Sequence, residues 1–340
     1  MPAYSRPVTE PPDLTAILVA PDGLTEVRKT LSAVHDQDIR DRIEVVLVSD
    51  DPSALGGVEA LYPDFWGVEV VAFEPIERMG PAKAAGVRRA RADLVVQLED
   101  HAYPRPGWAR ALVDAWKEGV WSAVAPVMGN ANPASSTSWA NLFVGYGRWV
   151  APSESGEREA LPGHNSAFGR EVLLASGERM GADLDDDWGY FQRLAADGHR
   201  FYLTADAEVA HQNISNWKAA VTLRYHHGRL TAAARSREWS PMSRAAHALA
   251  TPLIPVLRFR EIWSQVRSSG VDPGVRRRLL PSLLLMVLVG GLGEGVGYAF
   301  GEGDSPGRKA DLEHDRGRHL SRADRADFER ELREMVADTA

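Results

Sequence analysis

The sequence predicts an α/β protein built on a Rossmann-like, mostly parallel sheet flanked by helices. Two observations carry this prediction. Over the first hundred residues, short runs rich in Val, Ile and Leu alternate with segments that have the apolar spacing of a helix, which is the pattern of a parallel sheet. Polar residues that can bind ligands also follow directly after several of these runs. Open α/β sheets bind their ligands at the carboxyl ends of the strands. The candidate ligand-binding residues are therefore expected at the edge of the sheet where such proteins have their sites.

The expected elements follow from these runs. Strands are expected at 15–20, 43–49, 68–73 and in the run that ends at Glu99, and later within WSAVAPVMG and RFYLTADAEVAH. Helices are expected at 25–34 and 81–92. The chain is divided into a Pro-rich flexible tail (1–12), an α/β domain (13–215), a helical region (216–301) and a charged tail (302–340) with one short amphipathic helix.

The composition narrows the class of protein. The 340 residues suffice for one large domain or a domain with an extension, and 44% hydrophobic with 25% charged residues is ordinary for a globular chain. A net charge of −8 argues against a nucleic-acid-binding protein. The absence of cysteine excludes disulfides, thiol catalysis and zinc–thiolate sites. The N-terminus lacks the apolar stretch of a signal peptide, so we expect a cytoplasmic protein.

The helical region has two apolar stretches, 245–257 and 279–292, and the segment between them holds six arginines against two acidic residues. Pro281 and the Gly290-Gly291 pair interrupt the second stretch, as does Glu294 just beyond it, so it falls short of the ~20 residues that span a bilayer. Apolar segments beside arginine clusters favour monotopic attachment to an anionic membrane surface. The expected location is therefore the cytoplasmic face of the cell membrane. The alternative is a pair of buried core helices.

The segment QLEDHAYPRPGW (97–108) is the most informative part of the chain. A buried strand ends there in Glu99-Asp100-His101, and a Pro- and Gly-containing turn follows. A carboxylate and an imidazole two residues apart can point the same way from an extended segment and share one divalent cation. The alternative is a polar turn with a solvated His101.

Three further segments carry candidate site residues. Asp50 ends the second expected strand, where it could accept a hydrogen bond from the imide N–H of uracil or form a simple Asx turn. Gly163-His164-Asn165 precedes Arg170 and an apolar helix. The run Asp185-Asp186-Asp187-Trp188 precedes a helix that Gly198 ends and a strand that leads to His211. Helix capping is the alternative role in this run, for Asp185 in particular.

These segments, in this order, resemble family 2 glycosyltransferases with the GT-A fold over residues 13 to 215. The resemblance implies a nucleotide-sugar site formed by Pro21, Asp50, Lys83 in GPAKAAG, Glu99 and Asp100. It places the family's acidic pair on Asp186 and Asp187, because Arg193-Leu194 and Gly198 sit at the matching offsets. It places the late metal-binding histidine on His211. The metal motif is ExH where the family has DxD, similar to the DxH variant of polypeptide N-acetylgalactosaminyltransferases.

The resemblance implies inverting, metal-dependent transfer of a hexosyl group from a UDP-sugar to a hydroxyl acceptor. His101 and His211 are the expected metal ligands, and imidazole ligands favour Mn²⁺ over Mg²⁺. Asp187 is the expected general base, with its pKa raised by burial against Trp188. Asp186, His164, Asn165 and Trp188 are expected to hold the acceptor or the diphosphate.

The acceptor and the alternatives also follow from the sequence. The processive-synthase QxxRW motif is absent, since RYHHGR occupies that stretch, so single addition is favoured. Membrane-directed helices favour a lipid-linked or envelope-polysaccharide acceptor. A catalytically inactive membrane scaffold remains an alternative. A sugar nucleotidyltransferase is less favoured, because the loop Ala20-Pro21-Asp22-Gly23 lacks a basic residue, and no GxGxxG follows the first strand as a dinucleotide-dependent oxidoreductase would require.

Overall fold

The computed structural model describes residues 10–21, 23–313 and 316–338. The chain divides into two compact units, which we describe one at a time. Unit 1 comprises residues up to 127 together with 154–209, and unit 2 comprises residues 128–153 together with 210–340. Most of the predicted flexible tail (1–12) falls on residues 1–9, which lie outside the described residues.

One nine-stranded sheet runs in the order β3-β2-β1-β4-β8-β6-β9-β5, with β7 paired to β9. The neighbours among β3, β2, β1 and β4 are parallel, whereas β4–β8, β6–β8 and β7–β9 are antiparallel. The expected α/β sheet is therefore present, parallel in its first four strands and mixed as a whole. The strands are β1 (Leu14–Val19), β2 (Ile43–Ser49), β3 (Gly67–Ala72), β4 (Leu94–Gln97), β5 (Ala102–Pro104), β6 (Ala123–Asn130), β7 (Gly156–Arg158), β8 (Ala167–Gly169) and β9 (Phe201–His211).

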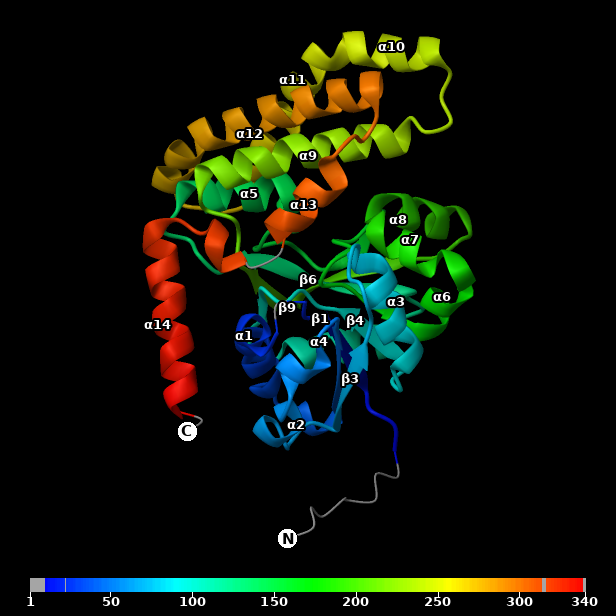
Figure 1. The fold of residues 1–340 in the computed structure, drawn as a ribbon, viewed down its shortest axis with the longest axis vertical. Coiled ribbons are helices and arrows are strands. Elements are labelled where there is room, and N and C mark those ends of the chain that lie inside the picture. Colours follow the sequence, from blue (N-terminus) through cyan, green and yellow to red (C-terminus); the bar gives the residue numbers. More distant parts are fainter. Residues whose placement is uncertain (1–9, 22, 314–315, 339–340) are drawn as a thin grey trace. The chain divides into compact units, whose positions relative to one another are not determined.

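Helices flank the sheet of unit 1 (Figure 1). Strands β1, β2 and β4 are buried along their whole length, as expected for strands covered on both faces. Helix α3 lies against β1 and β2, and Gly86 permits this approach because a Cβ there would lie 2.6 Å from the Ile17 side chain. The helices are α1 (Leu24–His35), α2 (Val58–Leu61), α3 (Met79–Arg89), α4 (Trp108–Glu118), α6 (Arg170–Ala175), α7 (Met180–Asp185) and α8 (Asp187–Ala196), with short 3₁₀ turns at 40–42, 52–55 and 177–179.

Unit 2 is mainly helical. Its long helices α9 and α12 pack along one another (Figure 1). A Cβ on Gly293 or Gly297 would overlap the carbonyl oxygen of Tyr225 or Arg229, so the two backbones are in close contact. The elements are α5 (Ser136–Tyr146), η3 (Gly147–Trp149), α9 (Trp217–Arg235), α10 (Pro241–Ala250), η5 (Thr251–Leu253), α11 (Ile254–Ser268), α12 (Pro273–Phe300), α13 (Ser305–Glu313), η6 (Arg316–His319) and α14 (Arg322–Asp338).

Unit 2 corrects three sequence-based expectations. The apolar stretch 279–292 is not broken: α12 is one 28-residue helix that continues through Pro281 and its glycines. At Gly293 and Gly297, close packing against α9 outweighs the ~1 kcal/mol helix penalty of each glycine. The stretch 245–257 is two helices, which separate at the prolines of TPLIP. The charged tail holds α13 and a 17-residue α14 where one short helix was expected.

Helix α12 is long and apolar enough to cross a membrane, judged by length and composition only. It is the one helix among the described residues that meets this test, and 39% of its most apolar window is buried inside the protein. The core helix of a protein without a membrane segment can satisfy the same criterion.

Candidate active site

The turn between β4 and β5 carries Glu99, Asp100 and His101. The His101 side chain is buried, and its Nδ1 lies 2.6 Å from Oδ1 of Asp100. Since a carboxylate only accepts hydrogen bonds, Nδ1 carries a proton, and Nε2 is the nitrogen that can act as a metal ligand. That Nε2 lies 3.7 Å from Oε1 of Glu99. The Asp100 carboxylate thus sets the imidazole in the form that can bind a metal.

Asn165 fixes Glu99 from the opposite strand segment. Its side-chain Oδ1 accepts from the Glu99 backbone N–H (3.1 Å), and its Nδ2 donates to Oε2 of Glu99 (2.7 Å). Asn165 is fully buried and has a φ of 69°, in the left-handed region that asparagine tolerates better than most residues. This conformation lets one short side chain hold both the backbone and the carboxylate of the ExH segment.

Glu99, His101 and His211 form a possible metal site. Each offers one ligand atom, and these atoms all lie within 4.8 Å of one another. The sheet accounts for the grouping: β5 follows His101 directly, β9 ends at His211, and these strands are neighbours, with Arg105 N–H bonded to the Glu208 carbonyl. One carboxylate and two imidazoles are a donor set that suits a borderline first-row divalent cation.

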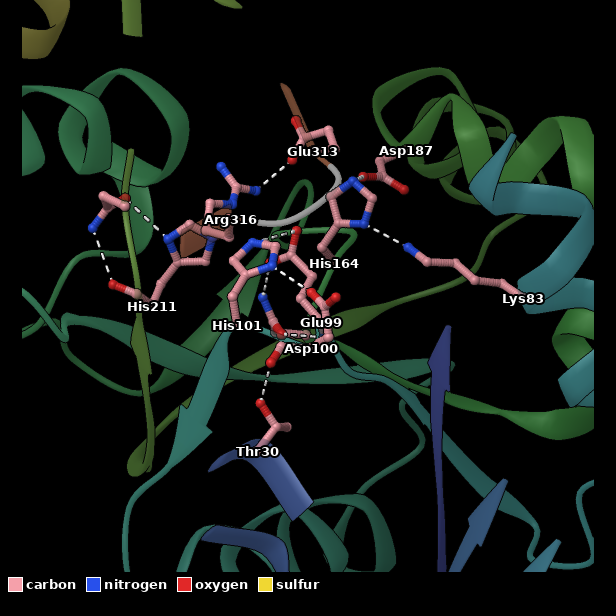
Figure 2. Close-up of polar contacts among 12 residues, drawn as sticks. Thr30, Lys83, Glu99, Asp100, His101, His164, Asp187, His211, Glu313 and Arg316 are labelled. Carbon is pink, nitrogen blue, oxygen red and sulfur yellow. Dashed lines mark hydrogen bonds and ion pairs between the residues drawn. The ribbon is translucent and has the colours of Figure 1, made fainter. Parts of the chain in front are cut away.

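A second group joins three predicted residues from separate segments of unit 1 (Figure 2). The Nζ of Lys83 lies 2.6 Å from Nδ1 of His164, and Nε2 of His164 lies 3.3 Å from Oδ2 of Asp187. An ammonium group only donates, so Nδ1 of His164 accepts and Nε2 carries a proton that can be donated to Asp187. Lys83, from α3, therefore sets the imidazole so that it faces the aspartate at the start of α8.

Glycine and backbone contacts hold this second group in place. A Cβ at Gly163 would overlap the Asp187 carboxylate, so the segment before His164 must have no side chain there. Asp185 accepts from the Gly80 backbone N–H (2.7 Å) and pairs with Arg78 (2.8 Å). Its carboxylate thus lies at the N-terminus of α3, where the helix dipole favours negative charge.

Capping in the acidic run falls on a different residue from the one expected. Asp185 ends α7, whereas Asp186 is the N-cap of α8 and its Oδ1 accepts from the Gly189 N–H (3.2 Å). The expected burial of Asp187 against Trp188 is also not seen, since the indole is 45% exposed. Neighbouring residues on a helix point about 100° apart, which separates Trp188 from the side of α8 that carries Asp187.

The remaining predicted residues lie at strand ends. Pro21 follows β1 and Asp50 follows β2, and both are half-buried. Because β1 and β2 pair in parallel, the two residues lie at the same edge of the sheet. The Asp100 carboxylate, expected to contact the nucleotide sugar, is engaged with His101 in this structure.

Sequence reasoning missed Thr30, and it did not foresee that Asp185 contacts α3. Thr30 donates from Oγ1 to the Asp100 carbonyl over 2.5 Å, and nothing in its helical spacing marks a partner 70 residues away. Asp185 supports the N-terminus of α3, as described above. That role has a sequence signal, because RMGPAK offers no Ser, Thr, Asp or Asn to cap the helix, and the N-cap residue Arg78 forms no side-chain cap hydrogen bond.

Comparison with known proteins decides the class of the site. Residues 17–173 match the family model for glycosyl transferase family 2. These residues form a family 2 glycosyltransferase domain. The protein is therefore a glycosyltransferase, and the sequence-based prediction of its family and enzyme class is confirmed. Asp186, Asp187 and His211 lie beyond the matched residues.

Solved glycosyltransferase structures resemble the chain at low identity. Mannosyltransferase PcManGT from Pyrobaculum calidifontis, in complex with GDP-Man and Mn²⁺, is 17% identical over 97% of this chain and 88% of that chain, with a TM-score of 0.47. GalNAc-T7 with UDP, GalNAc and Mn²⁺ is 16% identical over 58% of this chain and 43% of that chain (TM-score 0.45). TarS 1–349 from S. aureus in complex with UDP-GlcNAc is 13% identical over 80% of this chain and 71% of that chain, with a TM-score of 0.44.

No curated protein shows significant similarity to the chain. The fold class predicted from the sequence is confirmed: a GT-A glycosyltransferase with a mixed sheet, flanking helices and an apolar C-terminal helix.

Proposed function

We propose that this glycosyltransferase moves one sugar at a time from a UDP-sugar to a hydroxyl acceptor, with inversion and with dependence on a divalent cation, Mn²⁺ in preference to Mg²⁺. The observation that carries the proposal is the Lys83–His164–Asp187 contact. It joins the residues expected to serve the diphosphate, the acceptor and the proton transfer. The glycosyltransferase family of residues 17–173 supplies the reaction class.

Asp187 is the proposed general base. Nε2 of His164 lies 3.3 Å from Oδ2 of Asp187, a contact that can orient the carboxylate for an incoming hydroxyl. The acceptor oxygen loses its proton to Asp187 as it attacks the anomeric carbon from the face opposite the leaving diphosphate. An α-linked nucleotide sugar then gives a β-glycoside.

The donor is held by groups at the carboxyl edge of the sheet. Asp50, after β2, accepts from the imide N–H of uracil, and Pro21 lies beside it after β1. Lys83 provides a positive charge for the diphosphate. Glu99, His101 and His211 would hold the divalent cation, which when bound stabilises the negative charge of the departing UDP.

A turnover assay with a panel of UDP- and GDP-sugars, with Mn²⁺ or Mg²⁺, tests this proposal. Asp187→Asn should lower transfer by about 10²–10⁴-fold, the usual range for loss of a general base, and leave UDP binding by calorimetry nearly unchanged. Asp197→Asn, at the exposed end of the same helix, is the matched control. Full activity in Asp187→Asn would remove Asp187 from the role, and no turnover with any sugar would favour the inactive scaffold.

The cation assignment has its own test. His101→Ala should weaken UDP binding in the presence of Mn²⁺ and have little effect in its absence, because the side chain would act only through the cation. Loss of a residue that only holds a metal ligand in place already lowers metal affinity by about 10–100-fold, so loss of the ligand itself should lower it further. Unchanged Mn²⁺ dependence in His101→Ala would refute the ligand role.

We further propose that unit 2 attaches the enzyme to the cytoplasmic face of the cell membrane without crossing it. Apolar residues on one side of α12 and on η5–α11 are 40–67% exposed, namely Leu253, Val256, Leu257, Leu284, Leu285, Leu288 and Leu292. A patch of this kind marks an interaction surface. The exposed arginines 260, 267, 277 and 278 on the same helices complement an anionic bilayer. Monotopic attachment fits better than spanning, because α12 packs along the polar helix α9 and buries Glu294.

Flotation with vesicles tests the membrane proposal. The protein should bind vesicles of equal parts phosphatidylcholine and phosphatidylglycerol more tightly than pure phosphatidylcholine, and Leu285→Gln with Leu288→Gln should release it. Val120→Gln alters an equally exposed apolar residue of unit 1 (76% exposed) and should have no effect. Binding that survives the double change in full would contradict the assignment. A lipid-linked or envelope-polysaccharide acceptor is the substrate class that such attachment favours.

A further inference from the structure

An asparagine pair in unit 2 determines the form of the His211 imidazole. Nδ1 of His211 lies 2.9 Å from Oδ1 of Asn213. The Asn213 Nδ2 donates to the His211 carbonyl (3.0 Å) and to Oδ1 of Asn130 (3.2 Å). A carbonyl oxygen only accepts, so the Asn213 amide cannot be reversed. Its Oδ1 therefore faces Nδ1, which must carry a proton, and Nε2 is the nitrogen that can act as a metal ligand.

Asn132 in turn holds Asn213 through two reciprocal hydrogen bonds. The Asn213 backbone N–H donates to Oδ1 of Asn132 (3.0 Å), and Nδ2 of Asn132 donates to the Asn213 carbonyl (2.9 Å). Ser138 Oγ also donates to Oδ1 of Asn132 (2.7 Å). The orientation of this second amide is fixed by the same argument, because the Asn213 carbonyl can only accept.

The chain of contacts ends on the C-terminal helix. The remaining donor of Asn132 Nδ2 reaches Oδ2 of Asp324 on α14 (3.3 Å), and Asp324 is 6% exposed. The segment before α14 is fastened just beyond His211, since the N–H groups of Ser215 and Asn216 both donate to the His319 carbonyl (3.2 and 2.9 Å). Ser321 N–H donates to Ser215 Oγ (2.7 Å) as well. A buried carboxylate is costly unless it is hydrogen-bonded, so Asp324 and Asn132 stabilise one another.

We propose that Asn213, Asn132 and Asp324 are positioning residues for the metal ligand His211, so that α14 is a functional part of the metal centre. The inference rests on the proposed cation site. His101 supplies the precedent in unit 1: there the Asp100 carboxylate holds Nδ1, and here an amide does so. Partners that hold the second nitrogen of a ligating histidine fix its tautomer and raise its affinity for the metal.

The test measures Mn²⁺ binding to the full chain directly, by electron paramagnetic resonance of free Mn²⁺ in the presence of UDP. Asn213→Ala and Asp324→Ala should weaken Mn²⁺ binding by about 10–100-fold. Asp324→Asn should stay near the wild type, because its amide oxygen can still accept from Asn132. Asp327→Ala, on the same helix but 56% exposed at its side chain, is the matched control. Melting followed by circular dichroism identifies any variant that does not fold.

Kinetics separate positioning from a merely structural role. Activity of Asp324→Ala should recover when Mn²⁺ is raised, and the KM for the donor sugar at saturating Mn²⁺ should match the wild type. In the unaltered protein, nitrogen-15 spectra of labelled histidine should show His211 protonated at Nδ1, identified by the signal lost in His211→Ala. This spectrum needs none of the positioning variants to fold.

The outcomes distinguish this inference from the proposed function. Wild-type protein that binds Mn²⁺ through His101, with unchanged affinity in folded Asn213→Ala and Asp324→Ala, overturns the inference alone. An Nε2-protonated His211 overturns it too. Wild-type protein that binds no Mn²⁺ overturns the cation part of the proposed function and the inference with it.

Discussion

Unit 1 and unit 2 differ in how many of their large apolar side chains are exposed. Among the described residues, the large apolar side chains that are exposed include only Val120 and Trp188 from unit 1, whereas eleven come from unit 2. Both units bury charge: Glu44 in unit 1 is 0% exposed and pairs with Arg91, and Glu294 on α12 in unit 2 is 2% exposed and pairs with Arg258 at 2.8 Å. Unit 1 buries most of its large apolar side chains, whereas unit 2 leaves many of them exposed, where they can contact a membrane or another protein.

The two units also differ in what their glycines leave room for. In unit 1, Gly163 leaves room for the carboxylate of Asp187, a proposed catalytic residue. In unit 2, Gly293 and Gly297 leave room for the backbone of α9. A methyl group added at the first position should therefore affect chemistry, and one added at the second should affect stability.

The largest effect is expected for Gly163→Ala. The new Cβ would overlap the Asp187 carboxylate, which must move by about 1 Å, and a misplacement of that size can cost about 10²-fold in rate. Donor-sugar KM should change little, whereas the melting temperature should fall, because the new Cβ would also lie 2.3 Å from the Asp187 Cβ, which is fixed to the start of α8. Steady-state kinetics and thermal melting measure both quantities.

Gly67→Ala is the matched control, since a Cβ at Gly67 meets nothing within 4 Å. Its kcat should equal that of the wild type. If Gly163→Ala retained full kcat, Asp187 would either not be the base or not be held by this contact.

The strand ends show what the sequence could predict. Local signals sufficed for Ile43–Ser49, which is a strand as expected, because strand ends are determined by nearby residues. Lys83 and His211 were singled out by the resemblance to family 2 glycosyltransferases. The structure brings Lys83 together with His164 and Asp187 and groups His211 with Glu99 and His101, while their roles stay predictions.

The sequence-based predictions failed where contacts between residues far apart in the chain determine the structure. Helix α12 continues through Pro281, and its glycines 293 and 297 lie against the backbone of α9, a partner that no window of sequence reveals. The contact between Asp324 and Asn132 spans 192 positions, so a segment that reads as a charged tail is in fact tied to the strand end at His211. Capping of α8 fell on Asp186 rather than Asp185 because Asp185 is the last residue of the preceding helix, α7.

An intermediate effect is expected for Gly293→Ala in unit 2. Its Cβ would overlap the Tyr225 carbonyl, which must push α9 and α12 apart, and overpacking of this kind costs about 1–3 kcal/mol. Urea unfolding should show the loss while kcat at low temperature stays near the wild type. Gly307→Ala in α13 meets nothing within 4 Å and should be neutral or slightly stabilising. Equal stability in the two variants would mean that α9 and α12 are not in close contact.

The smallest effect concerns Asp186, which has both a structural and a proposed catalytic role. As the N-cap of α8 it accepts from the Gly189 N–H, so Asp186→Ala should lower the free energy of unfolding by about 1 kcal/mol. Asp186→Ser should restore that stability, because serine caps helices as well as aspartate does. It should not restore full kcat, since a hydroxyl cannot orient the acceptor as a carboxylate does. Wild-type kcat in Asp186→Ser would assign Asp186 to the helix alone and leave Asp187 as the single catalytic carboxylate of the acidic run.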